Sequence, residues 1–182
     1  MKNFLLVQTA FNCHQLALIC EEDVQQLWES NRPRDTLQFL MATLPEIQIK
    51  PLAGIVFIQG PGSFTALRIG ATWVNTLIYV LKIPVFSFSS LEYVAFSNKQ
   101  SLDSMAITFD EKRYFYWQAG EVLEQAIAPD NKFLVNPDKN PITVNNELCR
   151  EILAHLTNKQ VSMVDVLYVT PPKITQKKEQ TC

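Results

Sequence analysis

Residues 59–70 read Gln-Gly-Pro-Gly-Ser-Phe-Thr-Ala-Leu-Arg-Ile-Gly and decide how the rest of the chain is interpreted. They follow an apolar run, residues 53–58, that is typical of a strand buried on both faces. Gly60 and Gly62 permit a sharp turn where a side chain would clash. Ser63 is a good helix cap, because its hydroxyl can accept from a free backbone N–H. A strand, a tight turn and a helix in this order predict an α/β architecture.

A glycine-rich turn between a strand and a helix is also where phosphate-binding loops occur. This turn lacks the Lys-Ser/Thr pair that ends a P-loop and the G-x-G-x-x-G spacing of a dinucleotide site. Pro61 stiffens the turn and removes one N–H that a phosphate could use. The residues therefore favour a structural turn, with phosphate binding as the alternative.

The helix predicted from Ser63 to Leu81 carries one charge, Arg68, and apolar side chains all around its axis. A helix that only covers a sheet needs a single apolar stripe. This helix is therefore expected to be covered on a second side, either within the chain or by another subunit. Arg68, Asn75 and several threonines interrupt the run, so we do not interpret it as a membrane span.

The composition excludes several classes of protein. The chain has 182 residues, of which 47% are hydrophobic and 19% charged, and its net charge of −2 gives no overall attraction to nucleic acid. Its four cysteines and two histidines lack metal-binding spacing, so no metal site is predicted. Scattered cysteines and the absence of a signal-peptide pattern predict a cytoplasmic protein.

Before the strand at residues 53–58, a helix is predicted between Pro33 and Pro45. Proline is tolerated in the first turn of a helix and stops a helix further on. The apolar stripe of this helix is interpreted as facing the sheet, and Phe39 lies off this stripe, so a second side can be covered as well. The stripe consists of Leu37, Leu40, Met41 and Leu44.

Strands and helices alternate through the first half of the chain, after three strands that meander and make the sheet mixed. A short helix opens at Ser89, which with Glu92 has the spacing of a capping box. The predicted strands are residues 4–9, 15–20, 24–29, 53–58 and 83–88, with a turn at residues 21–23.

A polar stretch, residues 97–104, marks the predicted lobe boundary. It divides the chain into an N-terminal lobe, residues 1–98, and a shortened C-terminal lobe, residues 99–182, that ends in a basic tail. In the second lobe, residues 105–109 and 114–118 are predicted to form a hairpin around a charged turn.

The remaining second half carries little recognisable chemistry. Asp110 and Glu111 are interpreted as a solvated turn, because no third ligand or nucleophile stands beside them for acid–base or metal chemistry. A short helix is predicted at residues 148–156 and an extended segment at residues 168–175. The basic pair Lys177-Lys178 is interpreted as a disordered tail, with contact to RNA or an acidic partner as the alternative.

Residues 60–70 closely resemble the signature of the TsaB (YeaZ) family, whose members take part in making the threonylcarbamoyl-adenosine modification of tRNA. The resemblance continues in the same order over nearly the whole chain. The other matching segments are residues 4–10, 83–85, 89–95, 107–117, 134–137 and 168–175.

The resemblance implies an actin-like/sugar-kinase-like (ASKHA) fold with two lobes, mixed sheets and, here, a reduced C-terminal lobe. It implies a pseudo-enzyme with no catalytic residues of its own, which pairs with TsaD, the paralogue that transfers the threonylcarbamoyl group to the adenosine next to the anticodon. TsaE joins the pair, TsaC supplies threonylcarbamoyl-adenylate, and tRNA is reached through the complex. No cofactor is implied for the chain itself, although a nucleotide at the subunit interface stays open, and a homodimer is expected of the isolated chain.

Pairing in the family uses the helix after the glycine-rich turn and the helix before it, which are the two helices expected above to be covered twice. The resemblance thus predicts a partner interface at Leu37, Leu40, Met41, Leu44, Phe64, Leu67, Arg68, Ala71, Asn75 and Ile78, beside a signature turn of Gly60, Pro61, Gly62 and Ser63.

The chain departs from the family pattern at three places. Gln8 stands where the family commonly has Asp, and an amide cannot supply the charge that Mg²⁺ prefers. Ala66 replaces a customary Gly, and the chain is shorter between residues 122 and 167. Two alternatives stay open: a nucleotide-binding ATPase or kinase-like enzyme of the same fold, and a self-associating scaffold.

Overall fold

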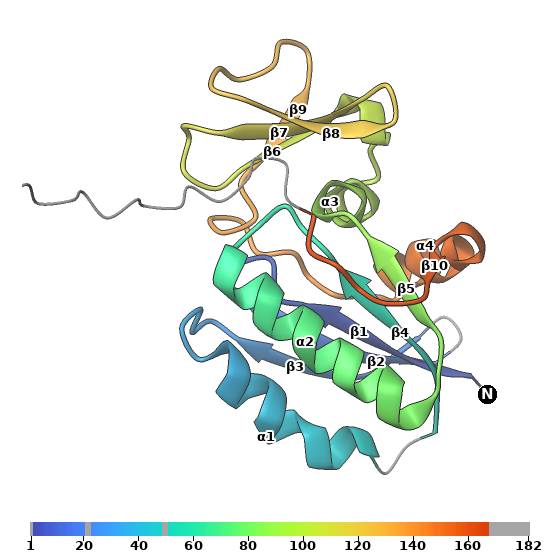
Figure 1. Ribbon diagram of the computed structural model, residues 1–182. Helices are drawn as coiled ribbons and strands as arrows, with labels where there is room; N and C mark the ends of the chain where they lie inside the picture. Colours follow the sequence, from blue (N-terminus) through green and yellow to red (C-terminus); the bar gives the residue numbers. More distant parts are fainter. Residues whose placement is uncertain (1, 21–22, 49–50, 168–182) are drawn as a thin grey trace, which may run out of the picture.

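The computed structural model describes residues 2–20, 23–48 and 51–167. Two β-sheets form the framework, a larger one below and a smaller one above in the view of Figure 1. The predicted segment at residues 168–175, the basic pair at residues 177–178 and part of the turn at residues 21–23 lie outside the described residues.

The larger sheet is mixed, as predicted. Its order is β10-β5-β4-β1-β2-β3, in which β1 pairs parallel with β4 and antiparallel with β2. Every residue of β2 is buried, because both faces of this sheet are covered. The strands are β1 (Asn3–Gln8), β2 (His14–Cys20), β3 (Asp23–Ser30), β4 (Leu52–Ile58), β5 (Val85–Phe88) and β10 (Gln160–Val161).

Four α-helices lie against these strands. α1 (Thr36–Gln48) and α2 (Phe64–Leu81) run side by side across one face of the sheet (Figure 1). α3 (Ser90–Asn98) contacts α4 (Asn146–Ala154), and α4 packs against β3. Within the described part of the chain, α2 alone is long and apolar enough to cross a membrane, yet it packs on β1 and β4 as a helix of the core.

The prediction that Pro45 ends the first helix is wrong. α1 continues to Gln48 with Pro45 inside it. Proline removes the hydrogen bond to the carbonyl four residues earlier, here that of Met41, which lies on an exposed turn. Ile47, in the turn after the proline, is only 2% exposed, so its burial favours continuing the helix.

The smaller sheet contains the predicted hairpin. Its order is β8-β7-β6-β9, and the turn of the hairpin is held by ion pairs of Asp110 with Arg113 and of Glu111 with Lys139, so the solvated-turn interpretation holds. Short 3₁₀ helices lie at Leu102–Ser104 and Leu156–Asn158. The strands are β6 (Met105–Thr108), β7 (Tyr114–Gln118), β8 (Glu121–Gln125) and β9 (Phe133–Val135).

After the smaller sheet the chain returns to the larger one. α4 and β10 pack there, and Val164 and Val166 are buried. The boundary at residues 97–104 does separate α3 from β6, but the lobe that precedes it is completed by residues beyond it. The division into 1–98 and 99–182 remains a prediction.

His14, at the start of β2, is fully buried, and its Nε2 lies 2.8 Å from the hydroxyl of Thr36. This burial lowers the pKa of His14 below its usual value. His14 therefore binds a proton more readily in the unfolded chain than in the folded one. Its contribution to folding stability is complete above the unfolded pKa, about 6.5, and decreases as pH falls below it.

We expect the melting temperature to fall when the pH is lowered from about 7.5 to about 5.5, the range in which an unfolded histidine titrates. The slope should flatten in His14→Gln and persist in His155→Gln, because His155 is exposed. Equal slopes in the wild type and in His14→Gln would contradict this assignment.

Candidate functional site

The signature turn is built by two glycines that no other residue could replace without strain. Gly60 has φ of +110°, a conformation that L side chains rarely adopt. A Cβ on Gly62 would lie 2.3 Å from the carbonyl oxygen of Ala10, in the loop between β1 and β2. The prediction of a turn that excludes side chains is confirmed.

The turn directs its hydrogen bonds into the protein. The backbone N–H of Ser63 donates to the carbonyl of Ala10 at 2.7 Å, and the carbonyl of Gly60 accepts from the N–H of Ser90 at 2.7 Å. The carbonyl of Gln59 accepts from the N–H of Leu167 at 2.8 Å. These bonds join the β1–β2 loop, α3 and the end of the described chain, as a structural turn requires.

Ser63 occupies the predicted capping position, but its hydroxyl makes no capping hydrogen bond. Ser89 makes the predicted capping box with Glu92 at the start of α3. The two serines differ in ψ, which is 110° at Ser63 and 157° at Ser89. The sequence predicted both capping positions, but only Ser89 makes the capping hydrogen bond.

Gln8, at the position where the family commonly has Asp, has a structural role. Its Nε2 donates to the carbonyl of Cys13 at 2.9 Å, and its Oε1 accepts from the N–H of Phe11 at 3.0 Å, which closes the β1–β2 loop. Neighbouring Gln15 accepts from the Tyr93 hydroxyl at 3.0 Å and donates to the carbonyl of Ile142 at 2.7 Å. Among the residues described, no group of three or more His, Cys, Asp or Glu side chains is arranged to hold a metal.

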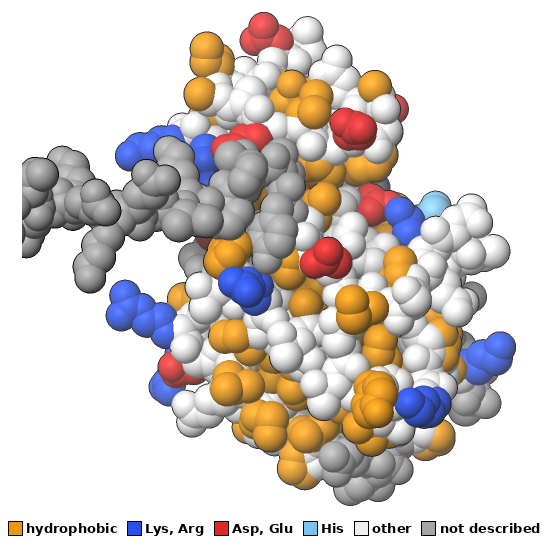
Figure 2. All heavy atoms as spheres, viewed as in Figure 1, with side chains coloured by type: hydrophobic (Ala, Val, Ile, Leu, Met, Phe, Trp, Pro, Cys, Tyr) orange, Lys and Arg blue, Asp and Glu red, His pale blue; other side chains and the backbone are white. Residues whose placement is uncertain are grey.

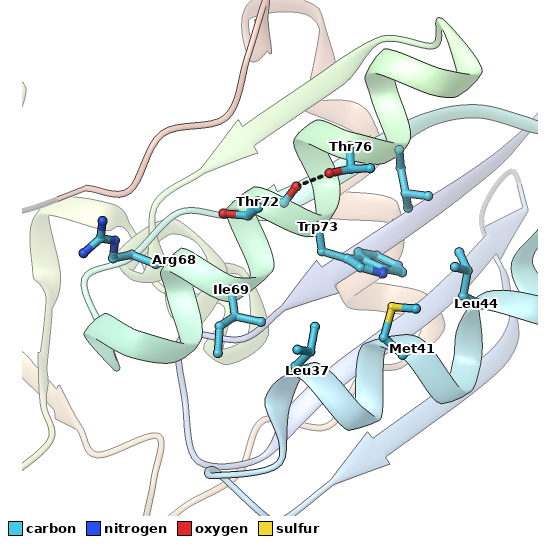
Figure 3. A pocket seen from close by; sticks show the side chains of 9 residues that line it. Leu37, Met41, Leu44, Arg68, Ile69, Thr72, Trp73 and Thr76 are labelled. Carbon is cyan, nitrogen blue, oxygen red and sulfur yellow. Dashed lines mark hydrogen bonds between the residues drawn. The ribbon is translucent and has the colours of Figure 1, made fainter.

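A groove between α1 and α2 is lined mainly by apolar side chains. Its volume is about 510 Å³. Figure 3 shows the side chains that line it, and Figure 2 shows hydrophobic side chains gathered over these helices. Two residues one helical turn apart form its outer wall, Leu37 at 55% exposed and Met41 at 52%. The lining is completed by Leu44 of α1 and by Arg68, Ile69, Thr72, Trp73, Thr76 and Leu77 of α2.

The four apolar residues predicted as one sheet-facing stripe of α1 divide between two faces. Leu40 is fully buried against the sheet, as predicted, whereas Leu37 and Met41 face outward and that part of the prediction is wrong. The buried face is offset along the helix, because threonines complete it. It consists of Thr36, Leu40, Thr43 and Ile47.

The candidates on α2 divide in the same way. Leu67 and Ala71 are 1% and 6% exposed, so they belong to the core of the subunit and not to its surface. Phe64 is 39% exposed, and the guanidinium carbon of Arg68 lies 5.3 Å from the centre of its ring. Ile78 is half-buried and packs against the core.

Asn75 holds another part of the chain. Its Nδ2 donates to the carbonyl of Val164, and its Oδ1 accepts from the N–H of Val164, both at 2.9 Å. Residues 159–167, called here the strap, cross α2 at this point and end beside the signature turn. The strap could not be predicted from the sequence, because its contact with Asn75 joins residues 89 positions apart.

Sequence reasoning missed the residues that form the α2 wall of the groove. Ile69, Trp73 and Leu77 follow one another at intervals of four residues, which is the spacing of one helical face. A count of apolar spacing could have separated this face from the core-facing one, which holds Leu67, Ala71 and Val74.

Comparisons with known proteins assign the chain to a family. The family model described as TsaD, tRNA N6-adenosine threonylcarbamoyltransferase, matches residues 31–130, which is more than half of the chain. The tRNA threonylcarbamoyladenosine biosynthesis protein TsaB of Buchnera aphidicola from Acyrthosiphon pisum is 28% identical over 126 residues, and TsaB of Bacillus subtilis is 34% identical over 90 residues. The chain belongs to the TsaB (YeaZ) family.

The alignments with these TsaB proteins cover 64% and 47% of the chain. The chain spans 57% and 39% of their lengths.

Two solved Pseudomonas aeruginosa structures share the fold of this TsaB-family chain. One is YeaZ and the other an uncharacterized protein with similarity to peptidase YEAZ. Both are 18% identical, with TM-scores of 0.62 and 0.67, and the matches cover 92% and 93% of the chain and the whole of each structure. The predicted mixed α/β fold of the ASKHA type is confirmed.

Proposed function

We propose that this chain is a non-catalytic subunit of the machinery that makes N6-threonylcarbamoyladenosine in tRNA, and that it pairs with TsaD in the cytoplasm. The similar TsaB proteins carry the name of this pathway. The pairing surface is the groove between α1 and α2.

The exposure of this groove is the observation that carries the proposal. Leu37 and Met41 are more than half exposed, while Trp73 and Leu77 of the α2 wall are 7% and 8% exposed. A contiguous apolar surface on a folded chain marks an interaction site more often than scattered apolar residues do. Covering it with the apolar face of a partner would contribute about 25 cal/mol for each Å² removed from water.

The absence of catalysis is supported by how the signature turn and Gln8 are used. The bonds of the turn to Ala10, Ser90 and the strap are made within the chain. Both ends of the Gln8 amide are engaged by the β1–β2 loop. A nucleotide-binding ATPase or kinase-like enzyme would need charged groups at this place for a metal and phosphates, so we favour the partner role.

The further members of the assembly follow from the same proposal. TsaE would join the pair, TsaC would supply threonylcarbamoyl-adenylate, and tRNA would be reached through the complex. The isolated chain would form a homodimer through the same groove, with a two-fold axis between the copies. A nucleotide at the subunit interface remains compatible with this assembly.

The proposal is tested by co-purifying the chain with TsaD of the same organism and sizing the product by light scattering. We expect one copy of each protein in a stable particle. If no complex forms, and ATP raises the melting temperature of the lone chain with a saturable dependence, the enzyme alternative replaces this proposal.

A further inference from the structure

We propose that Arg68 makes the groove selective for a partner other than a second copy of this chain, one that presents a carboxylate at the Arg68 end. This inference rests on the proposed function and specifies the chemistry of the partner at the same site.

Arg68 is the one charged side chain among the residues that line the groove. It extends from α2 at the end of the groove where both helices begin (Figure 3). Phe64 flanks its guanidinium, and Leu37 and Ile69 lie at the same end (Figure 3). A partner that covers this end therefore takes a permanent positive charge out of water.

The groove lining of a second copy offers no carboxylate to this charge. Outside the lining, two further acids stand on α1 and just before it. Glu46 accepts from Gln26 at 2.6 Å and from Trp28 at 3.3 Å, over β3, and Asp35 lies 4.0 Å from Arg32 in an exposed pair.

The consequence for a homodimer follows from its symmetry. Two copies related by a two-fold axis present the same patch to each other, so each Arg68 faces apolar side chains or the other Arg68. A charge buried without a partner is costly. An Asp or Glu supplied by a different protein would offset that cost, because its carboxylate would accept charge-assisted, bidentate hydrogen bonds from the Arg68 guanidinium.

The test compares Arg68→Met with the wild type in two equilibria, binding to TsaD by calorimetry and self-association by sedimentation, at about 0.05 M and about 0.5 M salt. We expect Arg68→Met to weaken binding to TsaD about tenfold at low salt and to lose its salt dependence. Self-association should stay equal or strengthen. Arg68→Glu should weaken binding to TsaD by about a further tenfold, since two acids then face each other.

Arg113→Met, in the turn between β6 and β7 of the smaller sheet, is the matched control and should leave both equilibria unchanged. Weaker self-association and weaker TsaD binding in equal measure would overturn the inference, since a packing role would affect both. Undiminished TsaD binding by Arg68→Glu would overturn this inference alone. Failure of the wild type to bind TsaD would overturn the proposed function together with it.

Discussion

Met41→Glu is expected to abolish pairing with TsaD while leaving the subunit folded. The Met41 side chain is 52% exposed in the lone chain, so a carboxylate there can remain in water until a partner covers the groove. Pairing would then bury an acid among Leu37, Leu44 and Trp73, which line the same groove. We expect a loss of at least about 100-fold in affinity, which corresponds to about 2.7 kcal/mol.

The measurement is calorimetric titration of TsaD with the variant, next to circular dichroism melting of the variant alone. Ile127→Glu is the matched control, because Ile127 is 79% exposed and follows β8 of the smaller sheet. It should bind TsaD like the wild type. Normal binding by Met41→Glu would remove the groove from the proposed interface.

Exposed positions are needed for this test because the buried candidates cannot separate binding from folding. Leu67→Glu or a charge at Ala71 would place an acid in the core, where both residues are at most 6% exposed. Lost pairing in such variants would report unfolding as readily as a broken interface.

Gly62→Ala is expected to destabilise the subunit strongly. The new Cβ would lie 2.3 Å from the carbonyl oxygen of Ala10 and 2.8 Å from its carbonyl carbon, so two backbones must move apart. The same movement weakens the hydrogen bond from the N–H of Ser63 to Ala10. We expect a loss of about 3 kcal/mol in the free energy of unfolding, which lowers the melting temperature of a chain of this size by about 6–12 °C.

Gly120→Ala provides the comparison. A Cβ there meets nothing within 4 Å, although φ is +92°. Only backbone strain of about 1 kcal/mol opposes this substitution, so the melting temperature should fall by about 2–4 °C. Equal melting temperatures for the two variants would show that the close approach at Gly62 relaxes without cost.

The elements of the fold could be predicted where local signals are strong. The apolar run of β4, the two glycines of the turn and the apolar length of α2 each specify their own conformation, and the structure contains all three. The local rule that proline ends a helix fails at Pro45, because it does not include the burial of Ile47, which only the folded structure reveals.

The groove could be predicted only in part. Sequence periodicity identified two helices with too many apolar residues, but it could not separate exposed Leu37 from buried Leu40, which lie three residues apart on α1. That division depends on threonines that complete the buried face, and threonine is not counted as apolar. The roles of Asn75 and Gln8 depend on partners in other segments, so no pattern in one segment could reveal them.

The strap has a consequence for how the protein is synthesised. During synthesis, Asn75 cannot form its hydrogen bonds until Val164, 89 residues later in the chain, has been made. At a synthesis rate of 5–20 residues per second, this delay is on the order of 5–20 s. During that time β5 lacks its neighbour β10, and its open edge is available to other chains. A chaperone that covers this edge until β10 is made would therefore keep the nascent chain from pairing with other chains.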